Sequence, residues 1–185
     1  WSAIDLSGLT DHSGGSSSDI KGIASNGSGK WMFCQGDRIY VSTNDGASFT
    51  VSVPSWSNSE SPGTMQGITY TNNSWVICYS RGSEPRFRSC ADSDTSDWSD
   101  ELSHGDAGDS WTGSIAHPSS QEKRVIMASA NGRVAAVSEL DDRIVYFDVN
   151  GKTMSNVAQA DLSMSGDTVY GMCTDGNTWM LACKD

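Results

Sequence analysis

The chain has 185 residues and a formal net charge of −11 at pH 7, and its length suits one hydrophobic core and a single domain. The acidic balance argues against a nucleic-acid partner, and no apolar run reaches the ~20 residues needed to cross a bilayer. Ser, Gly, Thr, Asn and Asp are abundant and hydrophobic residues come in short runs, which is typical of an all-β protein with many turns.

The first predicted elements form one four-stranded unit between residues 20 and 53. An apolar-x-Gly pattern begins at Ile20, and Trp31 opens a second strand after the turn Asn26-Gly27. A third strand, Arg38 to Val41, leads through a run of turn formers to Phe49, which opens the fourth. Asn, Asp and Gly favour tight hairpins because they hydrogen-bond locally or adopt positive φ.

The same order of signals recurs along the chain. The apolar-x-Gly glycines are 45, 46 and 58 residues apart: Gly22, Gly67, Gly113 and Gly171. Tryptophans that follow a turn open the second strands of three repeats: Trp31, Trp75 and Trp179. For the third repeat we expect a second strand at Val125 to Ala128, a third at Val134 to Val137 and a fourth at Ile144 to Phe147, with a loop from Asn150 to Asp167.

Four-stranded units of this length in series are typical of a β-propeller. Trp1 to Leu6 matches the fourth strands that open at Phe49 and Trp98, so the N-terminal segment is expected to complete a blade that the C-terminal residues begin. The prediction is a small ring of about four four-stranded blades, closed by the N- and C-terminal strands. Its repeats span residues 20–64, 65–110, 111–168, and a split blade of 169–185 plus 1–6.

The turn after the first repeat's third strand carries a recognisable motif. Ser42, Asn44, Gly46 and Phe49 stand in the order Ser-x-Asn-x-Gly-x-Ser-Phe, which resembles the Asp-box (BNR) motif of sialidase-like propellers, Ser-x-Asp-x-Gly-x-Thr-Trp. The resemblance implies a hairpin between third and fourth strands, away from the catalytic face. It makes these four residues turn and packing residues.

Cysteine and histidine spacing predicts no cofactor and no metal site. Cys34 and Cys78 each follow a Trp by three residues, so we interpret them as small buried side chains at equivalent positions. Cys173 and Cys183 either pair across a hairpin or stay free. The alternating carboxylates that begin at Asp92 lack the Gly and terminal Glu of a calcium-binding loop.

The resemblance also raises an enzymatic hypothesis. Sialidases need an arginine cluster for the substrate carboxylate, a Tyr nucleophile activated by a Glu, and an Asp acid/base. Arg81, Arg86 and Arg88 cluster near Glu84, but the family's Phe-Arg-Ile-Pro motif is absent. Because Arg86 and Arg88 alternate along one strand, we expect them to be solvent-facing charges on one side of a sheet. The prediction is no catalysis, with a sialidase-like glycoside hydrolase as the alternative.

A binding site is expected at one end of the propeller. There the loops that leave the fourth strands meet the turns between second and third strands. Trp56 lies in such a loop outside the strand pattern, His104 lies in an equivalent loop, and Arg81 and Arg86 flank a turn at the same end. Exposed aromatic side chains suit stacking on a sugar or a protein hot spot. The alternative for Trp56 is that it caps the core.

The composition resembles that of bacteriophage surface or tail proteins, which assemble in a reducing cytoplasm and later face the outside. We therefore expect a non-enzymatic module on a virion surface or in an extracellular setting. Its partners would be other virion proteins or a cell-surface glycan, with no nucleic acid and no membrane insertion. The alternative is a fragment of a larger secreted carbohydrate-binding propeller.

Overall fold

The computed structural model describes residues 20–52, 65–81, 84–103, 125–138, 143–162 and 168–184. The expected closing strand, Trp1 to Leu6, and the pattern around Gly113 lie outside these ranges. Within them every regular element is a β-strand, so the all-β prediction is confirmed. The same ranges contain no helix long and apolar enough to cross a membrane.

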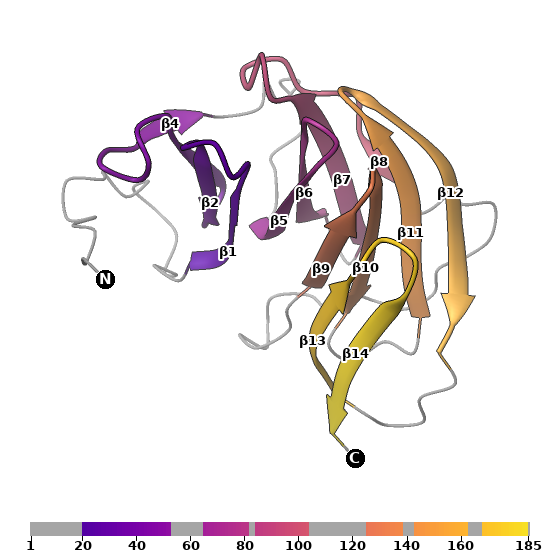
Figure 1. Ribbon diagram of the computed structural model, residues 1–185. Coiled ribbons are helices and arrows are strands. Elements are labelled where there is room, and N and C mark those ends of the chain that lie inside the picture. Colours follow the sequence, from indigo (N-terminus) through magenta and orange to yellow (C-terminus); the bar gives the residue numbers. More distant parts are fainter. Residues whose placement is uncertain are drawn as a thin grey trace.

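The strands form four antiparallel sheets, each built from consecutive segments of the chain (Figure 1). Sheet 1 contains β1 (Ile20–Ser25), β2 (Trp31–Gln35), β3 (Arg38–Ser42) and β4 (Thr50–Ser52). Sheet 2 contains β5 (Met65–Thr71), β6 (Ser74–Arg81), β7 (Glu84–Ala91) and β8 (Leu102–Ser103). Sheet 3 contains β9 (Val125–Ala130), β10 (Arg133–Ser138), β11 (Arg143–Asn150) and β12 (Thr153–Asp161). The terminal hairpin contains β13 (Thr168–Thr174) and β14 (Trp179–Lys184).

The first strand of each sheet lies against the first strand of the next. β1 contacts β5, β5 contacts β9, and β9 contacts β13, so the sheets follow one another in an arc. Sheet 1 and the terminal hairpin stand at its two ends (Figure 1). The described residues do not form a closed ring.

The third repeat differs from its prediction by one strand. Val125 to Ala128 was expected in a second strand, but β9 is the first strand of sheet 3 and lies against β5. The turn Asn131-Gly132 therefore joins first and second strands. The expected loop from Asn150 to Asp167 contains β12. The physical reason is that a two-residue hairpin looks the same in sequence wherever it falls in a meander.

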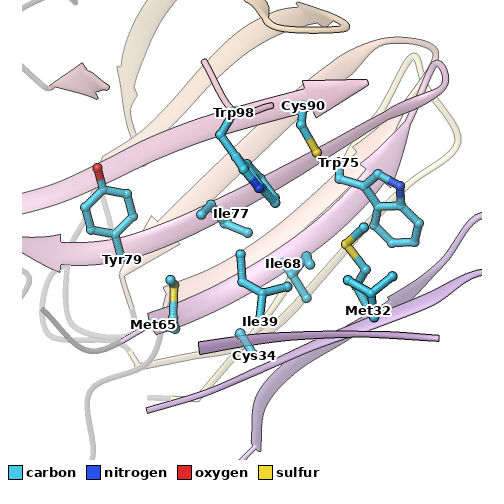
Figure 2. Packing of buried hydrophobic residues seen from close by; sticks show 11 residues of the cluster. Met32, Cys34, Ile39, Met65, Ile68, Trp75, Ile77, Tyr79, Cys90 and Trp98 are labelled. Carbon is cyan, nitrogen blue, oxygen red and sulfur yellow. The ribbon is translucent and has the colours of Figure 1, made fainter. Parts of the chain in front are cut away.

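Two hydrophobic clusters fill the spaces between the sheets, because sheet 2 buries both of its faces. Along β6, Trp75, Ile77 and Tyr79 point to sheet 1 while Val76 and Cys78 point to sheet 3. Figure 2 shows the first cluster, which joins sheets 1 and 2: Met32, Cys34, Ile39, Val41, Met65, Ile68, Trp75, Ile77, Tyr79, Cys90 and Trp98. The second joins sheets 2 and 3: Val76, Cys78, Phe87, Leu102, Val125, Val134, Ala136, Val145, Phe147 and Val149.

The predicted glycine of the first strand is explained by a close approach between sheets. A Cβ added to Gly22 would lie 2.9 Å from the backbone nitrogen of Ile68 and 3.2 Å from the Cα of Gly67. A side chain at this position would therefore push β1 away from β5. Thr69 and Ser129 hold the next pair of inner strands together, with their hydroxyl oxygens 2.6 Å apart.

Candidate functional site

Of the four predicted binding residues, the structure gives a side-chain position for one. Trp56 and His104 lie outside the described residues. Arg81 ends β6 and only its backbone is described. Arg86 lies in β7, opposite Tyr79 of β6. The site predicted from these four residues therefore stays a prediction.

Arg86 belongs instead to a cluster of ionisable groups inside sheet 2. The Tyr79 hydroxyl donates a 2.6 Å hydrogen bond to Glu101 Oε2 and accepts one of 3.2 Å from Arg88 Nε. Arg86 Nε lies 3.4 Å from Glu101 Oε1. Two guanidinium groups, one carboxylate and one phenol thus meet beside the first cluster, and we call them the Tyr79 cluster.

The prediction that Arg86 and Arg88 are solvent-facing charges is wrong. Arg88 is 7% exposed, and the Arg86 side chain is 18% exposed. The cross-strand pairs place Arg86 opposite Tyr79 and Arg88 opposite Ile77, on the face that sheet 1 covers. Strand alternation cannot distinguish an exposed face from a covered one when a sheet has neighbours on both sides.

The environment of Tyr79 favours its neutral form. Burial raises the pKa of the phenol, the hydrogen bond to Glu101 raises it further, and the hydrogen bond from Arg88 opposes both. Tyr79 is also only 1% exposed, so its oxygen is out of reach of a substrate. The Tyr79 cluster therefore acts as a buried polar network that fixes the end of sheet 2.

The predicted turn at Ser42 is held by its own side chains. Ser42 Oγ accepts hydrogen bonds from the backbone nitrogens of Gly46 (2.9 Å) and Asn44 (3.3 Å) and donates one of 2.8 Å to Asn44 Oδ1. Asn44 Oδ1 also accepts from the Ser48 nitrogen at 3.0 Å. Phe49 packs edge-on against Phe33, with ring centroids 4.9 Å apart. All four motif residues therefore have a turn or packing contact.

The corresponding turn of sheet 2 uses Asp92 to join two sheets. Asp92 Oδ1 accepts a 2.8 Å hydrogen bond from Trp75 Nε1 and forms a 2.8 Å ion pair with Lys30 Nζ of sheet 1. Its Oδ2 accepts a 3.0 Å hydrogen bond from Asn26, and its backbone oxygen accepts another from Lys30. Partial burial acts to raise the pKa of Asp92, but the bonds from Lys30, Trp75 and Asn26 outweigh it and lower the pKa.

Acid should therefore weaken the link between sheets 1 and 2. Because the folded-state pKa of Asp92 is lowered, its contribution to stability is present above the unfolded-state value of about 3.9 and is lost as pH falls through the folded value. We expect the free energy of unfolding of Asp92→Asn to be lower than that of the parent at pH 7. Below about pH 4 the two free energies should converge. Urea unfolding at each pH measures this. Asp100→Asn, an exposed carboxylate outside this network, controls for the lost charge, and equal losses from Asp92→Asn at pH 3 and pH 7 would contradict the assignment.

A hollow of about 420 Å³ lies where the turns of sheets 2 and 3 meet, and we call it the turn hollow. It is lined by Asn72, Asn73, Ala91, Asp92, Ser93, Asn150 and Gly151. Three hydrogen bonds hold its walls: Asn72 Nδ2 donates to Val149 O (3.2 Å), the Gly151 nitrogen to Ser74 Oγ (2.7 Å) and the Asp92 nitrogen to Asn73 O (2.8 Å). The sequence analysis placed Asn72 and Asn73 in a turn, Asp92 among alternating carboxylates, and Asn150 at the start of a loop expected at the binding end. One general rule could have indicated the hollow: in a packed series of meandering sheets, the first-to-second and third-to-fourth strand turns lie at the same end.

The asparagines that form the β5–β6 turn are set by the backbone. Asn72 and Asn73 have φ values of 47° and 53°, as a two-residue hairpin turn requires at both central positions. Asn tolerates this conformation better than most residues. The side chains of Asn72 and Asn73 are exposed, so the turn presents amide groups to solvent at a fixed place.

None of the five cysteines forms a disulfide. Burial raises the pKa of Cys34 and Cys90 to about 12 and raises that of Cys78, so these thiols stay protonated. Cys173 lies opposite Met180 and Cys183 opposite Val169, which separates the two cysteines that were candidates for a hairpin disulfide. Among the described residues no group of three His, Cys, Asp or Glu could hold a metal ion.

The chain is similar to several solved structures. The chain is similar to PorZ, described as an essential bacterial surface component of the type-IX secretion system of Porphyromonas gingivalis, with a TM-score of 0.50 and 12% identity over 89% of this chain and 18% of PorZ. For YCF48 bound to D1 peptide, the TM-score is 0.39 and the sequence identity 11%, over 100% of this chain and 65% of YCF48. For apo AztD from Citrobacter koseri, the TM-score is 0.32 and the sequence identity 13%, over 76% of this chain and 50% of AztD.

PorZ, with a TM-score of 0.50, has a β-propeller-type fold. This similarity and the arc of meandering sheets support a β-propeller-type fold for this chain. The chain spans about a fifth of the length of PorZ. No family model matches the sequence, and no curated protein does. The Asp-box family therefore stays a prediction from the motif at Ser42.

Proposed function

We propose that the chain is a non-enzymatic propeller module that binds a partner protein through the turn hollow. The observation that carries this proposal is a concavity built from three turns on two sheets, with asparagine, aspartate and serine among its lining residues. Asn72, Asn73, Ser93 and Asn150 are exposed around it, and asparagine side chains offer both donors and acceptors to a peptide backbone. The hydrogen bonds between the sheets hold these groups in place before binding, which lowers the entropy cost of association.

The charge of the chain favours a polar or basic partner surface. The net charge is −11, and the carboxylate of Asp92 lies in the wall of the hollow with a lowered pKa. A basic patch on the partner would be attracted at long range and oriented toward the hollow. A cell-surface glycan is the other ligand class that the amide and carboxylate groups suit, and the sequence composition supports a virion surface or an extracellular setting for either.

Two features support the absence of catalysis. The Tyr79 hydroxyl is buried and its pKa is raised, and the buried thiols Cys34, Cys78 and Cys90 also have raised pKa values. Both kinds of nucleophile need access and a lowered pKa. A sialidase-like hydrolase is the second candidate, because Tyr79, Glu101 and two arginines do meet in the Tyr79 cluster. Turnover of a sialoside by the purified chain above background would favour it.

Filling the hollow should weaken binding without unfolding the chain. Ser93→Tyr adds a bulky group at an exposed turn position, so we expect at least a tenfold rise in Kd, or about 1.4 kcal/mol. The ligand would be taken from a glycan array run beside a pull-down from virion lysate, and its Kd measured by calorimetry. Ser28→Tyr, in an exposed turn outside the hollow, is the matched control. Equal affinities of the parent and Ser93→Tyr, with both folded, would overturn the proposed site.

A further inference from the structure

Every Asn-Gly and Asp-Gly pair in the sequence has the same kind of backbone contact. There are three Asn-Gly pairs and two Asp-Gly pairs, and in each of them the glycine nitrogen donates a hydrogen bond to the hydroxyl of a serine or threonine. Three of these hydroxyls lie within four residues of their glycine, and two belong to another sheet. The five contacts are Gly27 with Ser25 (3.0 Å), Gly46 with Ser42 (2.9 Å), Gly132 with Thr71 (2.9 Å), Gly151 with Ser74 (2.7 Å) and Gly176 with Thr174 (2.9 Å).

Asn-Gly pairs are prone to deamidation, because glycine has no side chain to hinder attack of its nitrogen on the preceding residue. The glycine nitrogen loses its proton and bonds to the Cγ of the asparagine. The bond from Cγ to the amide nitrogen then breaks, and ammonia leaves with the proton that the backbone lost. Water adds to one of the two carbonyl carbons of the resulting succinimide ring and breaks its bond to the ring nitrogen. The product is aspartate or isoaspartate.

A hydrogen bond from the glycine nitrogen opposes the first step of this reaction. The nitrogen must give up its proton and turn toward Cγ, so the bond to the hydroxyl has to break first. The hydroxyls that bind the turns of sheet 3 are buried, since Thr71 is 6% exposed and Ser74 is 0% exposed. Asn131 and Asn150 are themselves exposed, so water reaches both amides. The hydroxyls of sheet 2, and not burial of the amides, therefore stand against deamidation.

We propose that Asn131 and Asn150 are latent deamidation sites, which Thr71 and Ser74 keep unreactive for as long as sheets 2 and 3 stay together. The two hydrogen bonds join residues 61 and 77 positions apart. Separation of the two sheets therefore breaks both bonds, even where each hairpin turn keeps its own shape. Deamidation then records that the interface between sheets 2 and 3 has opened.

The modification at Asn150 would change the turn hollow. Asn150 and Gly151 line the hollow together with Asp92. Deamidation replaces a neutral amide by a carboxylate, and the isoaspartate product also lengthens the backbone by one carbon. A chain whose sheets have separated thus acquires a second negative charge in the hollow, and the charge persists when the sheets pack together again. This reaction needs no ligand in the hollow.

Two substitutions test the protecting hydroxyls one at a time. Thr71→Val keeps the shape of the side chain and removes the acceptor for Asn131-Gly132, and Ser74→Ala removes the acceptor for Asn150-Gly151. The folded chains are incubated at mildly alkaline pH, and deamidation at each site is followed by peptide mapping with mass spectrometry. The measured quantity is the ratio of the rates at the two sites. A general loss of stability speeds both sites and leaves this ratio unchanged.

Thr71→Val should raise the ratio of the Asn131 rate to the Asn150 rate about fivefold, the fold-change that corresponds to a hydrogen bond of about 1 kcal/mol. Ser74→Ala should lower the same ratio by a similar factor. The parent also gives a test that needs no substitution: both sites should deamidate more slowly in the folded chain than in urea. Equal rates in the folded and the unfolded parent would overturn the proposal.

Thr69→Val is the matched control for Thr71→Val. Thr69 lies on the same strand, β5, and its hydroxyl oxygen lies 2.6 Å from that of Ser129 across the same interface. The same change of side chain therefore weakens the contact between sheets 2 and 3 without removing an acceptor from a glycine nitrogen. It should leave the ratio of the two rates as in the parent. If neither Thr71→Val nor Ser74→Ala moves the ratio further than Thr69→Val does, or if the folded variants show no deamidation, the hydroxyls do not protect these sites and the proposal is wrong.

Discussion

Replacing Trp75 with alanine is expected to destabilise the chain by about 3–5 kcal/mol, the cost of removing a large aromatic side chain from a packed core. Trp75 is fully buried between sheets 1 and 2 (Figure 2). Its ring centroid lies 4.7 Å from that of Tyr70, and its indole nitrogen donates to Asp92. The substitution therefore opens a cavity and also removes one of the bonds that hold the Asp92 carboxylate. Urea unfolding followed by fluorescence gives the free energy.

Trp31→Ala is the matched control, because Trp31 occupies the same position in sheet 1. Its indole nitrogen donates to Asp45 Oδ1 at 2.8 Å, as that of Trp75 does to Asp92. Trp31 is only half-buried, however. Its loss should cost roughly 1 kcal/mol, the centre of the range for single substitutions. Equal costs for the two substitutions would show that the interface between sheets 1 and 2 is not the main source of stability.

Gly22→Ala is the second substitution with a large expected effect. The new Cβ would lie 2.9 Å from the Ile68 nitrogen and 3.2 Å from the Gly67 Cα, and backbone atoms cannot move aside as the end of a side chain does. We expect a loss of about 1–3 kcal/mol, the usual cost of forcing atoms into a packed interface. Thermal unfolding should show a lower Tm.

Gly171→Ala controls for the loss of a glycine at the same position. Its Cβ would meet only Ala182, at 4.0 Å, so the stability should be unchanged within about 0.5 kcal/mol. A loss at Gly22→Ala no larger than that at Gly171→Ala would contradict the close approach of β1 and β5.

Strand order could be predicted wherever two independent signals agreed. In sheets 1 and 2 and in the terminal hairpin, a turn is followed by a Trp that begins or nearly begins the second strand: β2 starts at Trp31, β14 at Trp179, and Trp75 is the second residue of β6. Sheet 3 has no such Trp, so the turn Asn131-Gly132 was the one signal left for assigning its strand order. A hairpin turn alone does not say which pair of strands it joins.

The candidate sites could not be predicted because they depend on contacts between distant segments. The Lys30 contact with Asp92 spans 62 residues, and the bond from Asn72 to Val149 spans 77. Local patterns identify the turns but not which turns meet. The same limit applies to Arg86 and Arg88. Their alternation correctly places them on one face of a strand, but local sequence does not indicate that a neighbouring sheet buries that face.

The connectivity of the sheets has a consequence for how the chain folds. In each sheet every strand pairs with strands adjacent to it in sequence, so each unit can form from one short contiguous segment with little loop-closure entropy. Global stability then behaves as a sum of unit terms and nearest-neighbour terms, as in linear repeat arrays. Sheet 2 has two neighbours and the terminal hairpin has one. Amide hydrogen exchange should accordingly be slowest in β6 and fastest in β14, because opening begins at the unit with the fewest neighbours.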